Sequence, residues 1–151
     1  MKFIILILSL FSFSVFGQDT DFVPSDTVKD LNLPDKGKII LACKCLSKDR
    51  IYSVEIKPIE TSMCMHIQTA LVIDLDNHTL RDMNFEKKTL KDIFIYRDSI
   101  WTNQQLENYW LTYSLQNYTG FLQITKDYAK AFNGTYYDEY YFQCKLGEKL
   151  F

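Results

Sequence analysis

The chain has 151 residues and a formal net charge of −2, and it contains only five glycines and two histidines. Removing an apparent leader, residues 1–17, leaves a length that fits one domain. The glycines are too scattered for a phosphate-binding loop, which needs clustered backbone N–H groups, so dinucleotide-binding and P-loop folds are excluded. His66 and His78 lack the spacing of a histidine-rich hydrolase site, which excludes that metal chemistry as well.

The first segment has the pattern of a secretory signal peptide. Lys2 precedes the apolar run Phe3–Phe16, and Gly17 is a small residue at the expected cleavage point. The run is shorter than the roughly 20 residues that a membrane-spanning helix needs, so we expect no membrane insertion after the signal is removed. The remaining charges of both signs are interspersed, without the basic stripe of a nucleic-acid-binding protein. The sequence therefore predicts a periplasmic or secreted protein.

Four cysteines, Cys43, Cys45, Cys64 and Cys144, lie after the leader, and an even number in an oxidising compartment predicts two disulfides. On a strand, Cys43 and Cys45 would have Cα atoms roughly 6.6 to 6.8 Å apart, at the limit for a bridge, so each should bond elsewhere. Two pairings remain open: Cys43–Cys64 with Cys45–Cys144, or Cys43–Cys144 with Cys45–Cys64. The second would tie the last predicted strand to the first, as a closed sheet requires.

The first elements after the leader are an arm and a run of strands. Residues 18–36 are rich in aspartate and lack periodicity, which predicts an extended acidic arm, and residues 37–151 are expected to form a single β domain. Lys38–Leu46 and Ile51–Ile56 are predicted strands of a hairpin with Ser47–Arg50 as its polar loop.

Further strands follow at short intervals with turn residues between them. Met63–Asp76 ends in an alternating pattern of period two, which indicates a strand. The later predicted strands are Thr79–Met83 after the turn Asp76–His78, Ile93–Tyr96, Ile100–Thr102, Tyr109–Leu115, Phe121–Thr125 and Thr135–Leu146 after Asn133–Gly134. This spacing predicts an all-β fold, an antiparallel meander of about eight strands that closes into a small barrel or barrel-like sheet.

The string Met63-Cys64-Met65-His66 contains ligands of the kind that Cu(I) prefers in an exported protein. On a strand, the two methionines would share one face, and Cys64 and His66 the other. The pair Cys64–His66 is also the local candidate for a thiol nucleophile. We favour the simpler interpretation that Cys64 is oxidised and the methionines pack, so no cofactor is expected.

Aromatic side chains are the main candidates for a binding surface. The candidate residues are Trp101, Trp110, Tyr136, Tyr137, Tyr140 and Tyr141. Such side chains join a large apolar area to a polar tip and could hold sugar rings or the side chains of a partner protein. The alternative is that they serve β propensity and core packing. Asp74 and Asp76 are explained by turn capping without catalysis or calcium binding.

Three N-x-S/T sequons lie on predicted turns, at Asn77, Asn117 and Asn133. Several short motifs also resemble those of a loose group of small exported proteins of Gram-negative bacteria. These motifs are Ile73–Thr79, Ile100-Trp101, Tyr113–Gly120, and Cys144 followed by Lys149-Leu150-Phe151. The similarity spans Leu71–Phe151, although Asn117-Tyr118 replaces an Asn-Arg that is frequent in the group. It implies a periplasmic or secreted location and brings no activity.

The sequence thus predicts an exported, non-enzymatic, disulfide-stabilised β module that binds a protein or a cell-envelope ligand. An inhibitor or immunity-type protein is one concrete form, inferred from architecture alone. The alternatives are a periplasmic copper-binding protein that uses Met63, Cys64, Met65 and His66, and a small hydrolase.

Overall fold

The computed structural model describes residues 33, 34, 36–53, 57–128 and 135–147. The predicted signal peptide, nearly all of the acidic arm and the Asn133–Gly134 turn lie outside these residues. The fold is all-β and antiparallel, as predicted. The strands are β1 (Lys38–Tyr52), β2 (Glu60–Met63), β3 (Gln68–Asp74), β4 (Thr79–Asp82), β5 (Thr89–Leu90), β6 (Phe94–Ile95), β7 (Ser99–Gln105), β8 (Trp110–Gln116), β9 (Phe121–Asp127) and β10 (Tyr136–Leu146).

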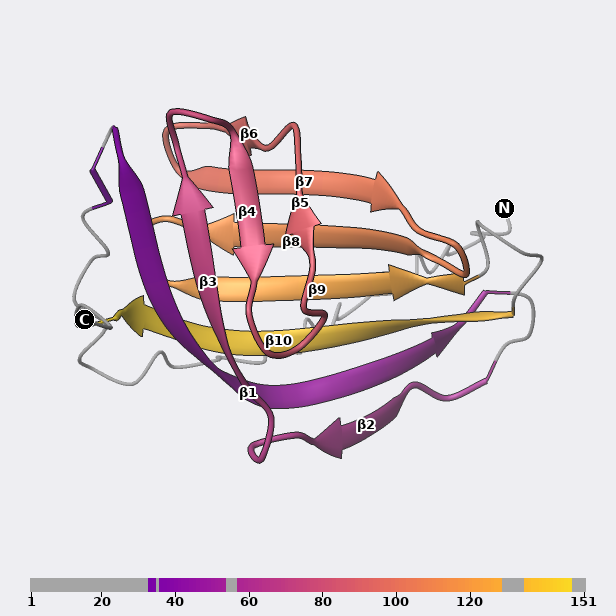
Figure 1. The fold of residues 1–151 in the computed structure, drawn as a ribbon. Helices are drawn as coiled ribbons and strands as arrows, with labels where there is room; N and C mark the ends of the chain where they lie inside the picture. Colours follow the sequence, from indigo (N-terminus) through magenta and orange to yellow (C-terminus); the bar gives the residue numbers. More distant parts are fainter. Residues whose placement is uncertain (1–32, 35, 54–56, 129–134, 148–151) are drawn as a thin grey trace, which may run out of the picture.

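The strands form one strongly curved sheet. Its order is β5-β4-β3-β1-β10-β9-β8-β7-β6, and β2 pairs with the second part of β1. The last strand, β10, lies beside the first in the middle of the sheet, and β3, β4 and β5 cross over β7–β10 (Figure 1). The two ends of this order, β5 and β6, follow each other in the chain but do not pair with each other. The result is a half-barrel with more strands than the sequence predicted.

The predicted hairpin with a loop at Ser47–Arg50 is wrong. The strand β1 continues through this segment, which pairs with β10 on one side and with β2 on the other. The register with β10 shifts between Cys45 and Ser47, so that Leu46 forms a bulge. A bulge bends a strand, and the bend in β1 lets its first part pair with β3 and its second part with β2 (Figure 1).

The single strand predicted over Met63–Asp76 is also wrong in its first part. The strand β2 ends at Met63 and β3 begins at Gln68, and between them Ile67 N–H donates to the carbonyl of Cys64 at 2.8 Å. The turn predicted at Asp76–His78 is confirmed. His78 has a φ of 50°, in the left-handed region.

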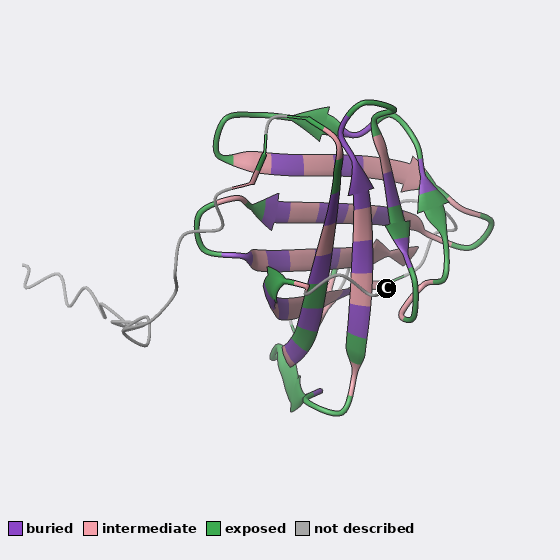
Figure 2. Ribbon diagram, turned by 60° about the vertical axis from the view of Figure 1, so that its left-hand side comes forward, coloured by how far each residue is buried: buried purple, intermediate pink, exposed green. Residues whose placement is uncertain are grey.

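Alternation along the strands separates a buried inner face from an outer face. Buried residues alternate with less buried ones along β7, β8, β9 and β10 (Figure 2). One inner row across the sheet consists of Leu115, Leu122, Phe142 and Cys45, all at 0% exposure. The strands β3–β5 cover the part of the inner face that contains this row, and they add Leu71, Ile73, Leu80 and Leu90 to the core. Within the described residues there is no helix long and apolar enough to cross a membrane.

Candidate functional site

Both disulfides of the structure involve β1. Cys43 is bonded to Cys144, its direct neighbour on β10, and Cys45 is bonded to Cys64 in the turn after β2. This is the second of the two pairings that the sequence left open. The first bond joins the first and last strands across a separation of 101 residues, and the second fixes the β2–β3 turn to the bulge. No cysteine of the described residues is free.

The string Met63–His66 does not form the ligand set that its strand geometry suggested. Cys64 is buried in a disulfide, so its sulfur is neither a thiolate ligand nor a nucleophile. Met63 and Met65 are exposed rather than packed in the core, with exposed fractions of 69% and 49%. His66 lies in the turn and is exposed. The hypothesis of a copper site at Met63–His66 is therefore weakened, because the Cys64 thiolate would have been its strongest ligand.

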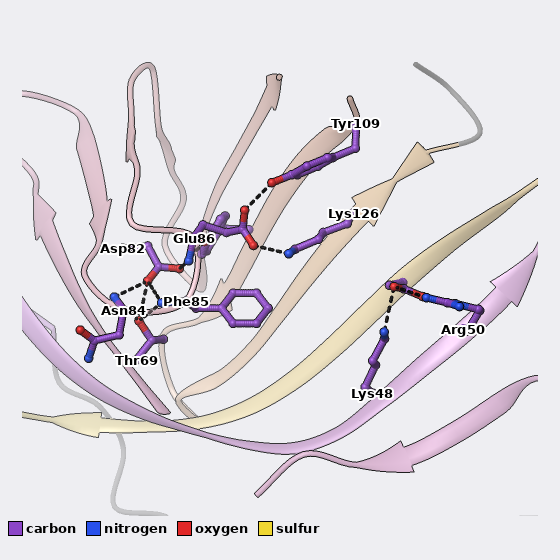
Figure 3. Close-up of polar contacts among 11 residues, drawn as sticks. Lys48, Arg50, Thr69, Asp82, Asn84, Phe85, Glu86, Tyr109 and Lys126 are labelled. Atoms are coloured by element: carbon purple, nitrogen blue, oxygen red, sulfur yellow. Dashed lines mark hydrogen bonds and ion pairs between the residues drawn. The ribbon is translucent and has the colours of Figure 1, made fainter. Parts of the chain in front are cut away.

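A buried carboxylate that the sequence analysis did not single out organises the inner face. Asp82, 1% exposed, accepts hydrogen bonds from the hydroxyls of Thr69 and Tyr113, each at 2.5 Å. It also accepts the backbone N–H groups of residues 84, 85 and 86 (Figure 3). Burial, followed by the charge of Asp82, raises the pKa of Tyr113, so this tyrosine remains a proton donor. These bonds join β3, β4 and β8.

Glu86 continues this polar network toward β9. Its carboxylate accepts a hydrogen bond from the Tyr109 hydroxyl and forms an ion pair with Lys126 (Figure 3). The Lys126 ammonium also lies over the rings of Phe85, Tyr109 and Tyr140. The Lys126 and Glu86 side chains are only 16% and 6% exposed, so the pair satisfies two charges that burial would otherwise penalise.

A second buried carboxylate, Asp138, pairs with two cations from β1. Arg50 donates to both of its oxygens, at 2.8 and 3.0 Å, and Lys48 lies 2.9 Å from it. Burial alone would raise the pKa of Asp138, but the hydrogen bonds from Arg50 and Lys48 lower it below its usual value. The inner cations Lys48, Arg50 and Lys126 thus each have a carboxylate partner.

We expect Asp138→Asn to lower the free energy of unfolding by about 2 kcal/mol at pH 7, since Arg50 and Lys48 lose their counter-charge but keep partial access to water. The folded-state pKa of Asp138 is depressed, so its contribution is present above the unfolded pKa of about 3.9 and disappears as the pH falls through the folded value. Urea titrations at pH 7 and pH 2 should therefore show a larger difference between variant and wild type at pH 7 than at pH 2. An equal difference at both values would contradict this assignment.

Four tyrosines form a row on the inner face, at the end away from Cys45 and Phe142. Tyr52 and Tyr136 lie in β1 and β10, Tyr109 precedes β8, and Tyr128 follows β9. The ring centroids of Tyr109 and Tyr128 are 5.3 Å apart, those of Tyr128 and Tyr136 are 5.1 Å apart, and those of Tyr136 and Tyr52 are 6.4 Å apart. The Arg50 guanidinium lies 4.3 Å from the centroid of Tyr136. Each contact between two aromatic rings typically stabilises the fold by about 0.5–1.5 kcal/mol. The row therefore packs this part of the half-barrel.

The outer face has a different composition. We call its central part the outer platform, which comprises Ser47, Asp49, Ile51, Trp101, Asn103, Gln105, Trp110, Thr112, Ser114, Gln123, Thr125, Asp127, Tyr137, Glu139 and Tyr141. These residues occupy three adjacent rows of the ladder. None is a lysine or an arginine, and the charged members are all acidic: Asp49, Asp127 and Glu139. The rest are aromatic, aliphatic or neutral polar.

The six aromatic residues predicted to bind are divided between the two faces. Tyr136 and Tyr140 point inward, where Tyr136 belongs to the tyrosine row and Tyr140 contacts Phe85 with ring centroids 4.8 Å apart. Trp101, Trp110, Tyr137 and Tyr141 occupy the outer platform. The single platform that the sequence suggested is thus two surfaces, and its outward members come from three strands.

Turn residues explain the remaining candidates. Asp74 accepts the backbone N–H and the side-chain amide of Asn77, at 3.1 and 2.9 Å, which is the capping role expected for it. These hydrogen bonds lower the pKa of Asp74. The sequons at Asn77 and Asn117 lie on turns, whereas Asn133 lies outside the described residues.

No family model and no curated protein matches the chain. Among solved structures, the chain is similar to HpuA of Kingella denitrificans in complex with human haemoglobin, with 10% identity and a TM-score of 0.39 over 81% of this chain and 47% of that one. It is also similar to the apo form of this haemoglobin receptor, with 10% identity and a TM-score of 0.37 over 83% of this chain and 49% of that one. The chain spans about half the length of these receptors.

Proposed function

We propose that this chain is an exported, non-enzymatic module that binds a partner protein on its outer platform. The observation that carries the proposal is the composition of this surface. Protein interfaces are enriched in tyrosine and tryptophan and depleted in lysine, and binding surfaces of antibodies combine such aromatics with small polar residues. The outer platform has this composition, with Trp101, Trp110, Tyr137 and Tyr141 among serine, threonine, asparagine and glutamine.

The rigidity of the platform favours this role. It is built on paired strands, and both neighbours of β10 in the sheet, β1 and β9, are hydrogen-bonded along it. The disulfide between Cys43 and Cys144 fixes β1 to β10. A preorganised surface loses little conformational entropy when a partner binds.

Two features support a location outside the cytosol. The N-terminal segment has the pattern of a secretory signal, and all described cysteines are oxidised, as is usual in an oxidising compartment. The resemblance to small exported proteins of Gram-negative bacteria agrees with this location. An inhibitor or immunity-type protein is the concrete form that we favour, since such proteins act by occupying a partner through a rigid surface.

Site-specific photo-crosslinking tests the proposal. A photoreactive phenylalanine analogue at Gln123, which lies on β9 in the outer platform between Ser114 and Tyr141, should give a discrete adduct with one protein when the full chain is exported in its own host. The same analogue at Arg81, an exposed position on β4, is the matched control and should give none. Adducts at Arg81 but not at Gln123 would contradict the assignment of the binding face.

A further inference from the structure

We propose that the partner is a basic protein that places an arginine side chain between Asp49 and Glu139. This inference rests on the proposed function. These residues lie directly opposite each other on β1 and β10, in the central row of the outer platform. Cβ atoms at such positions are about 4.5–5.5 Å apart. Thr125 follows in the same row on β9, and Thr61 on β2. The two carboxylates are therefore neighbours with neutral residues on either side.

The carboxylate pair lacks a counter-charge from the described part of the chain. Asp49 Oδ1 is buried and has no hydrogen-bond partner, and neither Asp49 nor Glu139 forms an ion pair with a described lysine or arginine. On the inner face, by contrast, Asp138 and Glu86 have basic partners, and Asp82 accepts hydrogen bonds from two hydroxyls and three backbone N–H groups. Like charges at opposite positions destabilise a sheet, so this arrangement calls for a cation from outside.

The geometry favours a guanidinium over a metal ion. A divalent calcium ion takes six to eight oxygen ligands, and the described residues contain no group of three acidic, histidine or cysteine ligands that could hold a metal. A planar guanidinium instead donates in a fork that matches carboxylates, and it stacks on aromatic rings. Tyr137 and Tyr141 flank Glu139 on the same face of β10 and supply such rings.

A hydrogen bond already orients one of the two acceptors. The Tyr141 hydroxyl donates to Glu139 Oε2 at 2.5 Å, which leaves the other carboxylate oxygen available to a ligand. Burial, followed by Glu139 and Asp49, raises the pKa of Tyr141, so the hydroxyl keeps its proton. Because Asp49 Oδ1 is buried and Glu139 Oε2 accepts from Tyr141, an arginine arriving from outside would meet Asp49 Oδ2, Glu139 Oε1 and an adjacent tyrosine ring.

A titration followed by NMR tests the recognition directly. The probe is N-acetyl-arginine amide, added to the isotope-labelled full chain, with N-acetyl-citrulline amide as its neutral counterpart. We expect saturable shifts of the backbone amides of Asp49, Glu139 and Tyr141 with the arginine probe and none with citrulline. Asp49→Asn and Glu139→Gln should each weaken binding at least tenfold, while Asp98→Asn, which removes an exposed carboxylate between β6 and β7, should leave it unchanged. Equal responses to both probes, or unchanged binding by Glu139→Gln, would overturn the proposal.

Thermal unfolding separates a binding role from a structural one. In the free protein, Glu139→Gln should raise Tm by about 1–4 °C, because it removes the like-charge repulsion between Glu139 and Asp49. A lower Tm would indicate that the charge of Glu139 stabilises the fold and would overturn the proposal.

The failure of this inference can be told apart from that of the proposed function. Crosslinking at Gln123 that persists in the Glu139→Gln variant would leave the outer platform as the binding face but exclude arginine recognition by the pair. Loss of the adduct in Glu139→Gln, with retention in Asp98→Asn, would support both. Absence of an adduct in the wild-type background would overturn the proposed function itself.

Discussion

Replacing Cys43 and Cys144 together by alanine is expected to lower the free energy of unfolding by about 4 to 5 kcal/mol. The bond closes a loop with a separation of 101 residues, and in the chain-entropy model a loop of about 100 residues corresponds to about 4.7 kcal/mol. Both cysteines are buried, each 3% exposed, so hydration of the new alanine side chains in the folded state does not offset the loss of unfolding free energy. Urea unfolding followed by the fluorescence of Trp101 and Trp110 measures the change.

The second disulfide provides the matched control for the first. Its sequence separation is 19 residues, for which the same model gives about 3 kcal/mol, so Cys45→Ala with Cys64→Ala should destabilise less. The order of the two effects is the critical result. A larger loss on removing Cys45–Cys64 would show that local packing at the β2–β3 turn, rather than chain entropy, determines what these bonds contribute.

We expect Asp82→Ala to lower the free energy of unfolding by about 3 to 5 kcal/mol. The substitution removes the shared acceptor of two hydroxyls and three backbone N–H groups, all of them around a side chain that is 1% exposed. A buried donor without an acceptor typically costs about 1–3 kcal/mol, and the bonds of a network depend on one another. Chemical denaturation, together with near-UV circular dichroism of the aromatic residues, measures the loss.

Single removals of the donors calibrate this effect. Thr69→Val and Tyr113→Phe each delete one hydroxyl that donates to Asp82, and each should cost about 1 to 2 kcal/mol, because the carboxylate keeps its other donors. Asp82→Ala must cost more than either. A smaller loss would mean that water reaches the vacated position and satisfies the donors in place of the carboxylate.

The charged residues on the two faces of the half-barrel are expected to have different roles. Inside, Asp82, Glu86 and Asp138 are each surrounded by donors or cations of the chain itself, and their removal is expected to affect stability. Outside, Asp49 and Glu139 form no ion pair with a described lysine or arginine, and their removal is expected to affect binding. A substitution series across both faces would therefore separate the fold from the function.

The predicted strands and turns depended on local signals that the structure largely preserves. Alternation around Tyr113 and the turns at Asp76–His78 and Asn117–Gly120 correspond to β8 and to the observed turns. Local polarity was misleading at Ser47–Arg50, because ion pairs with Asp138 and pairing on both sides keep this polar segment within β1. The Met63–Asp76 run failed for a related reason, since the disulfide to Cys45 places Cys64 in a turn.

By itself, the sequence determined an all-β fold, a framework of two disulfides and the exclusion of a bridge between Cys43 and Cys45, because these follow from spacing and composition. Only the tertiary structure decided the disulfide pairing and the side of the sheet to which each residue of β1 points. The bulge at Leu46 reverses the alternation, so that Lys48 and Arg50 point inward to Asp138 and Asp49 points outward to the platform. A one-residue shift of register exchanges the faces of a whole strand, and nothing in the local sequence signals where it occurs.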